Sequence, residues 1–172
     1  KGYTQEDLDY TMAQLNRVGI KVRMLMLVGY PTETIEDFHL TVDMFERYKP
    51  YLDAGTIEEV NLGLTLNLLK NTPLYDNKDE LNIIQANDHI NDWVSMDNPT
   101  LTYKERLRRR IILQARCEAL GYPVFESKNY LKQLISSWNE VSSMAEQSTT
   151  LIENISYDRE QNGLTAEVVN ES

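Results

Sequence analysis

Few residues of this chain carry side chains that could take part in chemistry. Cys117 is the single cysteine, so the chain has no pair of thiols for an internal disulfide. Asp88, His89 and Asp92 lie close together, but one histidine with two carboxylates lacks the number and spacing of a recognised metal site. We therefore predict no metal site here, and we expect Cys117 to pack as a small apolar side chain.

Five arginines crowd one predicted helix and form the only basic patch of the sequence: Arg106, Arg108, Arg109, Arg110 and Arg116. One interpretation is a site for a phosphate or an acidic partner. The other is a solvated helix face that pairs with the many nearby carboxylates. The net charge of −10 and the pI near 4.7 argue against nucleic acid or an anionic membrane as the main partner.

Small polar residues alternate with apolar ones in the segment 59–67, EVNLGLTLN. This alternation predicts a strand with two different faces. One face carries Val60, Leu62, Leu64 and Leu66, and the other carries Asn61, Gly63, Thr65 and Asn67. In an open sheet the polar row would meet water, whereas in a barrel-like α/β fold it would line the lumen. The sequence leaves both arrangements open.

The element that would position a site is the apolar run 21–28, KVRMLMLV, which Gly29-Tyr30-Pro31 closes. A short apolar run ended by Gly and Pro predicts a strand, and its lack of polar alternation predicts a parallel strand covered on both faces. A helix is expected to begin at Thr34. Ligands bind at the carboxyl ends of strands in such units, so we expect any site at this turn.

Capping patterns predict three helices, which begin after Thr4, Thr34 and Thr102. Their expected ranges are 5–18, 35 to about 48 with Pro50 in the following loop, and 103 to about 120. A fourth helix is predicted at 128–146. Residues 76–99 are expected to form a loop with one or two weak helical turns, and 148–172 to form a weak hairpin or a disordered tail.

The order of these elements and motifs resembles the later half of the radical SAM core, in the type associated with cobalamin-binding domains. The resemblance rests on Lys1-Gly-Tyr-Thr4, a helix, Gly19-Ile-Lys-Val22, a strand, Gly29-Tyr-Pro-Thr-Glu-Thr34, and a helix with Asp37-Phe38. The phrase at 67–75, NLLKNTPLY, keeps the family's Thr-Pro-Leu-Tyr at 72–75. It lacks the family's prolines before the threonine, and Asn71 stands where the family has glycine. The resemblance covers about residues 1–77.

The resemblance implies an α/β fold, namely a fragment of a partial (β/α) barrel with two parallel strands, about four helices and a helical C-terminal extension. Residues 1–77 would belong to the barrel, 78–147 to the helical extension and 148–172 to the weak hairpin or tail. The parent enzyme would cleave S-adenosylmethionine bound to a 4Fe–4S cluster and start radical chemistry on an unidentified substrate. The expectation that the parent enzyme binds cobalamin rests only on the likeness to a subfamily. The chain alone lacks the cluster cysteines, so it is expected to hold no cofactor and to be inactive.

The same resemblance assigns the adenosyl pocket to two strand ends, Val28, Gly29, Tyr30 and Pro31 in one and Asn67 and Leu68 in the other. Their expected roles are backbone hydrogen bonds and apolar contact, and no residue is expected to be catalytic. The expected partner is the missing N-terminal half of the enzyme. The open edge of strand 21–28 also predicts either a homodimer through that edge or cover by the C-terminal segment.

Two further expectations concern the cell compartment and a rival function. The single cysteine and the absence of an apolar run long enough to span a bilayer predict a cytoplasmic protein with no membrane partner. The rival hypothesis is a free-standing, non-enzymatic α/β interaction domain, with Trp93, Trp138 and the arginine-rich helix as its surface.

Overall fold

A computed structural model describes residues 4–85, 89–125, 136, 138 and 139. The described chain is mixed α/β, as predicted, with four helices and a two-stranded parallel sheet. Its elements are α1 (Gln5–Val18), β1 (Val22–Leu25), α2 (Ile35–Asp53), β2 (Ile57–Asn61), α3 (Pro73–Asp76), β3 (Ile83–Gln85), β4 (Trp93–Ser95) and α4 (Tyr103–Ala119). The predicted helix at 128–146, apart from 136, 138 and 139, and the predicted hairpin or tail at 148–172 lie outside the described residues.

The central sheet is parallel, which confirms the predicted pairing of its two strands. Met24 of β1 lies opposite Val60 of β2, and α2 connects the two strands. On its other side, β2 pairs with residues 123–125, because the Val60 N–H donates to the Pro123 carbonyl (2.8 Å) and the Phe125 N–H donates to the Val60 carbonyl (2.7 Å). Among the described residues no strand pairs with the outer edge of β1.

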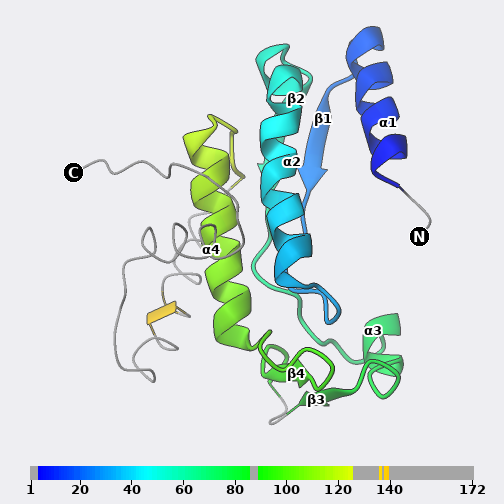
Figure 1. Ribbon diagram of the computed structural model, residues 1–172, viewed down its shortest axis with the longest axis vertical. Helices are drawn as coiled ribbons and strands as arrows, with labels where there is room; N and C mark the ends of the chain where they lie inside the picture. The colour runs from blue at the N-terminus through cyan, green and yellow to red at the C-terminus, as the bar shows by residue number, and fades with distance from the viewer. Residues whose placement is uncertain (1–3, 86–88, 126–135, 137, 140–172) are drawn as a thin grey trace.

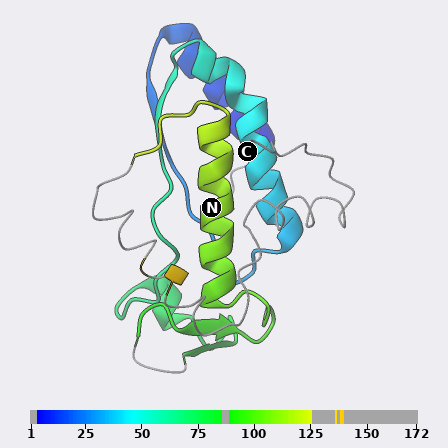
Figure 2. The ribbon, with the colours of Figure 1, turned by 90° about the vertical axis from the view of Figure 1, so that its left-hand side faces the viewer.

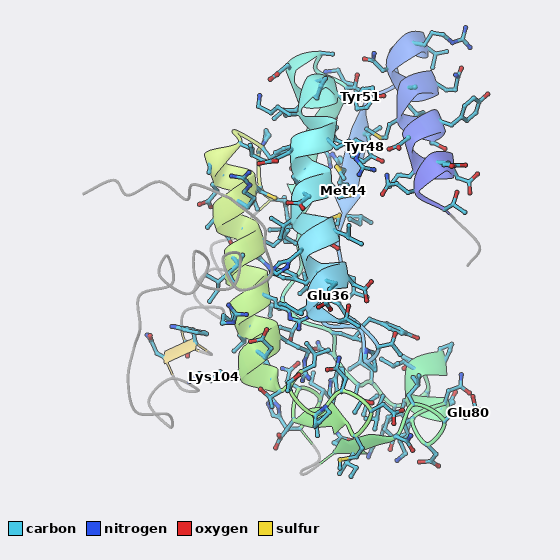
Figure 3. All side chains as sticks on the ribbon, viewed as in Figure 1. Glu36, Met44, Tyr48, Tyr51, Glu80 and Lys104 are labelled. Atoms are coloured by element: carbon cyan, nitrogen blue, oxygen red, sulfur yellow. The ribbon has the colours of Figure 1, made fainter. Side chains whose placement is uncertain are left out.

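Helices α1, α2 and α4 lie on one face of this sheet (Figures 1 and 2). They share one apolar core with the strands, which includes Met12, Phe45, Val60, Leu113 and Cys117. Cys117 packs in this core as predicted, and burial raises the pKa of its thiol to about 12. On the neighbouring helices, the Tyr48 hydroxyl donates to the Asp9 carboxylate (2.7 Å). Figure 3 shows Tyr48 on the side of α2 that faces α1.

The prediction that strand 21–28 is covered on both faces is wrong. β1 spans only Val22–Leu25 and its residues alternate in burial. Leu25 is 80% exposed and Leu27 is 54% exposed, whereas Met24 and Val28 contact the core. The error arose because leucines occupy the exposed positions after Arg23, so the sequence shows little of the polar alternation that marks a half-buried strand. We call the face that carries Arg23, Leu25 and Leu27 the uncovered face.

The predicted strand at 59–67 is also wrong in its extent, because β2 ends at Asn61. The chain turns at Gly63, which has φ +61° and whose N–H donates to Asn61 Oδ1 (3.0 Å). The Gly63 carbonyl accepts a hydrogen bond from Arg110 Nε (2.6 Å), in the place of one from a neighbouring strand. Val60 and Leu62 are fully buried, as the alternation predicted, but Leu64 and Leu66 are only half-buried.

The second helix is longer than predicted. α2 continues to Asp53 and passes through Pro50, which was expected in the following loop. Pro50 is exposed and lies in the last turn. Its ring removes only one backbone donor, the one that would have bonded to the carbonyl four residues earlier.

Residues 76–99 form more regular structure than the predicted loop with weak helical turns. β3 and β4 pair as an antiparallel hairpin, with Ile84 opposite Val94. Leu68, Ile83 and Trp93 form a second small core beneath it. Each strand has only three residues, too few for an alternating pattern to be recognised in the sequence.

Candidate functional site

The turn at the carboxyl end of β1 is the centre of the predicted site, and its local structure follows from its own residues. Gly29 has φ +85°, a backbone conformation that favours glycine. The Glu33 carboxylate accepts from the Gly29 N–H (3.1 Å), and the Glu33 N–H donates to the Tyr30 carbonyl (2.8 Å). Thr34 then begins α2 with a capping box to Asp37, as predicted.

Residues far along the chain hold this turn in place. Arg109 Nη1 donates to Glu33 Oε2 and to the Thr34 carbonyl, both at 2.9 Å. Asn98 Nδ2 donates to the carbonyls of Glu33 (2.9 Å) and Pro31 (3.3 Å). Figure 3 shows why this is possible, since the labelled first-turn residues Glu36 of α2 and Lys104 of α4 lie toward the same end of the molecule. The turn is therefore fixed from both α4 and the loop before it.

The charges around the turn are paired and mostly buried. Burial raises the pKa of Glu33 above its usual value, and the hydrogen bond from Arg109 only partly opposes this shift. Arg109 Nε also donates to Glu105 Oε1 (2.9 Å). Burial alone would raise the pKa of Glu105, but hydrogen bonds and charge from Arg108 and Arg109 outweigh it and lower that pKa. Arg109 thus lies between two carboxylates.

Arg106 is completely buried beside the same turn. Its guanidinium donates to the carbonyls of Trp93 (3.0 Å), Leu101 (2.8 Å) and Asn91 (2.6 Å), and its central carbon lies 3.8 Å from the centre of the Trp93 ring. Burial lowers the pKa of Arg106 to about 10, so the group remains protonated at neutral pH. A Cβ on Gly29 would lie 2.5 Å from Arg106 Cδ, and the side-chain stem therefore requires glycine there.

The second predicted site segment is joined to this arrangement through Trp93. Trp93 Nε1 donates to the Leu66 carbonyl (3.1 Å). Leu68 is buried against Ile83 and Trp93, and its N–H donates to the Ile90 carbonyl (2.8 Å). The segment 66–68 follows the end of β2, but it is held by the hairpin and not by the sheet.

The structure gives the six predicted site residues two different environments. The residues Val28, Gly29, Pro31 and Leu68 are buried, whereas Tyr30 is 45% exposed and Asn67 is half-buried. Of these six residues, Tyr30 and Asn67 are therefore the two whose side chains a ligand could contact. The connection between the two segments passes from Gly29 through Arg106 and Trp93 to Leu66.

The solvated helix face, one of the two interpretations of the arginines, is wrong for Arg106, Arg109 and Arg110, which are 0%, 3% and 2% exposed, whereas the pairing with carboxylates that it included is present at Arg108 and Arg109. Trp93 is 3% exposed, so Trp93 and these three arginines do not belong to the surface expected for an interaction domain. Glu33, Asn98 and the role of Arg106 were not predicted. A signal existed in the helical spacing of Arg106, Arg109, Arg110, Leu113 and Cys117, which places arginines and core residues on one stripe.

Comparison with known proteins gave no relatives. No family model matches the chain, and neither a curated protein nor a solved structure shows significant similarity to it. Within residues 4–85 and 89–125 no group of His, Cys, Asp and Glu side chains is arranged to hold a metal ion. No helix in the described part of the chain is long and apolar enough to cross a membrane.

Proposed function

We propose that this chain is the later part of a radical SAM core, whose parent enzyme cleaves S-adenosylmethionine to start radical chemistry on a substrate still to be identified. The observation that carries the proposal is the Gly29–Pro31 turn at the carboxyl end of β1, in a parallel sheet whose helices lie on one face. The turn and the segment 67–68 would contact the adenosyl group, through backbone groups and apolar side chains.

The arrangement of the helices supports a partial (β/α) barrel. In such barrels the helices surround the strands, the inner face is enclosed, and ligands bind at the carboxyl ends of the strands. Here α1 and α2 lie on the same side of β1 and β2, and residues 123–125 extend the sheet in parallel. The uncovered face, to which Asn61 opposite Leu25 also belongs, would then be the inner face.

The backbone at Asn71 supports the resemblance independently. Asn71 has φ +63° and occupies the position at which the family phrase has glycine. Asparagine is among the few non-glycine residues that adopt this left-handed conformation readily. The sequence therefore departs from the family in residue type while it keeps a backbone that glycine would adopt.

The proposal assigns limited roles to the residues of this chain. They would bind and orient the adenosyl group and exclude water from it, while the 4Fe–4S cluster, and cobalamin if the subfamily likeness holds, would supply the redox chemistry. The cluster thiolates would come from the N-terminal half of the enzyme, which would pair with the free edge of β1. We propose a cytoplasmic parent.

A titration of the parent enzyme, with its N-terminal half present, with S-adenosylhomocysteine, a non-reactive adenosyl ligand, tests this proposal, because this chain alone is expected to hold no cofactor. We expect the amide NMR resonances of Gly29, Tyr30 and Asn67 to shift, and those of α1 to stay unchanged. Homocysteine serves as the control ligand, because it carries the amino-acid group without the adenosyl group, and it should leave the three resonances unchanged. Binding that is absent, or that shifts other regions, would overturn the adenosyl assignment.

The coding sequence upstream of Lys1 gives a second test. A CxxxCxxC motif within about 150 codons, roughly four βα units of a barrel, supports the radical SAM proposal. A stop codon followed by a native start site supports a free-standing interaction domain. That second candidate is favoured by the exposure of Leu25 and Leu27 on the uncovered face, since exposed apolar patches mark interaction surfaces.

A further inference from the structure

We propose that Arg106 is a positioning residue that sets the separation between the Gly29–Pro31 turn and the segment 66–68. The inference rests on the proposed function only in treating these two segments as one ligand site. The positioning itself concerns contacts among residues of this chain.

Arg106 lies against the turn directly and is connected to the segment 66–68 through Trp93. The stem of Arg106 lies so close to Gly29 that a Cβ there would be 2.6 Å from Arg106 Cγ. The guanidinium stacks on Trp93, whose indole N–H in turn holds the Leu66 carbonyl. A shift of Arg106 along α4 would therefore move the turn and the segment 66–68 relative to each other.

The chemistry of this position requires arginine in particular. All hydrogen-bond partners of Arg106 among the described residues are backbone carbonyls, from Asn91, Trp93 and Leu101. A planar guanidinium can donate to several carbonyls and stack on an aromatic ring at the same time, whereas a lysine ammonium is a compact point charge. We infer that shape as well as charge is needed here.

The neighbouring arginines of α4 have different tasks. Arg109 connects α4 with the turn through Glu33 and Thr34, and Arg110 connects α4 with Gly63. Arg108 forms an ion pair with Glu105 of its own helix (2.8 Å). Of these arginines, Arg106 is the one that lies against Gly29 and stacks on Trp93 in the described part of the chain, and Arg108 on the same helix serves as the control.

The test compares Arg106→Met, Arg106→Lys and Arg108→Met by NMR-detected hydrogen exchange. The probes are the Gly29 amide, which bonds to Glu33, and the Trp93 indole N–H, which bonds to Leu66. We expect Arg106→Met to accelerate exchange of both probes by about tenfold or more, and Arg106→Lys not to restore protection. Arg108→Met should leave the Trp93 probe unchanged, and the control is read at that probe because Glu105, the partner of Arg108, also binds Arg109, which binds Glu33. A response of only one probe, or full rescue by lysine, would overturn the inference.

A second measurement decides the question if the Arg106 variants do not fold. Gly29→Ala pushes a methyl group against the Arg106 stem and should shift the Trp93 indole resonance, although Trp93 lies in a different element. Gly121→Ala has the same positive φ but an open environment, so it should leave that resonance unchanged. An unchanged Trp93 resonance in Gly29→Ala would mean that the two segments are not coupled through Arg106.

S-adenosylhomocysteine separates this inference from the proposed function. If the parent enzyme binds it, Arg106→Met in that enzyme should weaken binding about tenfold while Arg108→Met does not. If the parent enzyme does not bind it, the adenosyl assignment fails, and the two exchange probes still decide whether Arg106 positions the segments.

Discussion

Arg106, Arg109 and Arg110 show how a charged stripe can belong to the interior of a small domain. Arginine is mostly exposed in proteins, so both interpretations of the sequence, a site for a phosphate or an acidic partner and a solvated face, placed these side chains at the surface. Burial is possible because Glu33 and Glu105 pair with Arg109, and because carbonyls of Gly63, Asn91, Trp93 and Leu101 accept hydrogen bonds from Arg106 and Arg110. Those carbonyls come from the hairpin and from loops, whose positions no local pattern encodes. The residue types were visible in the sequence, but their partners were not.

Gly29→Ala should destabilise the chain more than Gly121→Ala. Both glycines have similar positive φ values, +85° and +81°, so each alanine carries a backbone penalty of about 1–2 kcal/mol. Only Gly29 also faces the Arg106 stem, and overpacking typically adds about 1–3 kcal/mol. Urea unfolding of the two variants measures the difference. Equal losses of free energy would show that the Arg106 stem adjusts without cost.

Glu33→Gln should change the pH dependence of stability in a defined direction. Because burial raises the pKa of Glu33 in the folded chain, its contribution to stability is complete below the unfolded pKa and is lost as pH rises through the folded pKa. The free energy of unfolding of Glu33→Gln, relative to that of wild type, should therefore be higher at pH 7 than at pH 4. Urea unfolding at both pH values measures this change.

Asp37→Asn is the matched control for Glu33→Gln. Hydrogen bonds from Thr34 lower the pKa of Asp37, so its contribution is present above the unfolded pKa and is lost as pH falls. The free energy of unfolding of Asp37→Asn, relative to that of wild type, should therefore be lower at pH 7 than at pH 4. The same sign of pH dependence in both variants would contradict the assigned shifts.

At the scale of elements, the starts of α1, α2 and α4 were predicted well and the strands poorly. The caps at Thr4, Thr34 and Thr102 are local, and each accepts the backbone N–H of the residue three positions later, so the helix starts could be read directly. The strand predicted at 59–67 ends at Asn61. The Gly63 carbonyl just beyond it accepts a hydrogen bond from Arg110, 47 residues further along the chain. Strand length thus depended on a partner distant in sequence.

The two faces of β1 should tolerate charge very differently. We expect Leu25→Lys and Leu27→Lys to change the free energy of unfolding by no more than about 0.5 kcal/mol, as is usual for exposed positions. Met24→Lys, on the same strand but packed against the core, should cost several times as much, because a lysine there would bury charge or displace the core. Thermal or urea unfolding compares the three. A large cost for Leu25→Lys would show that the uncovered face is covered in solution.

At the scale of the whole molecule, the parallel arrangement followed from sequence because a strand, a Gly-Pro turn and a helix recur in a fixed order. The hairpin β3–β4 and its small core did not follow, since they depend on Trp93 meeting Leu68 and on Arg106 stacking from α4. The candidate site was predicted at the turn after β1 from general rules of α/β folds, and it stays a prediction. The side chains that hold this turn, Asn98 and Arg109, come from far along the chain and could not be predicted.

The predicted homodimer through the free edge of β1 can be tested by sedimentation. The N–H groups of Val22 and Met26 bond to Thr56 and Asn61, so by alternation that of Leu25 points to the outer edge. We expect the mass to rise from 20.0 kDa toward twice that value with concentration. Salt should favour the dimer, because each chain carries a net charge of −10.

Leu25→Pro is the edge-specific variant for this experiment, because proline removes a donor that β2 does not use. It should remain at 20.0 kDa and retain the circular dichroism spectrum of the wild type. A wild-type chain that stays monomeric at every concentration and salt would contradict the dimer.

The distance along the chain between the turn and the side chains that hold it has a consequence during synthesis. Asn98 and Arg109 lie 65 to 76 residues beyond the carbonyls they bind. At a translation rate of about 5–20 residues per second, the turn leaves the ribosome several seconds before these partners. The nascent β1–α2–β2 unit therefore remains for that interval without the hydrogen bonds that fix the turn between β1 and α2.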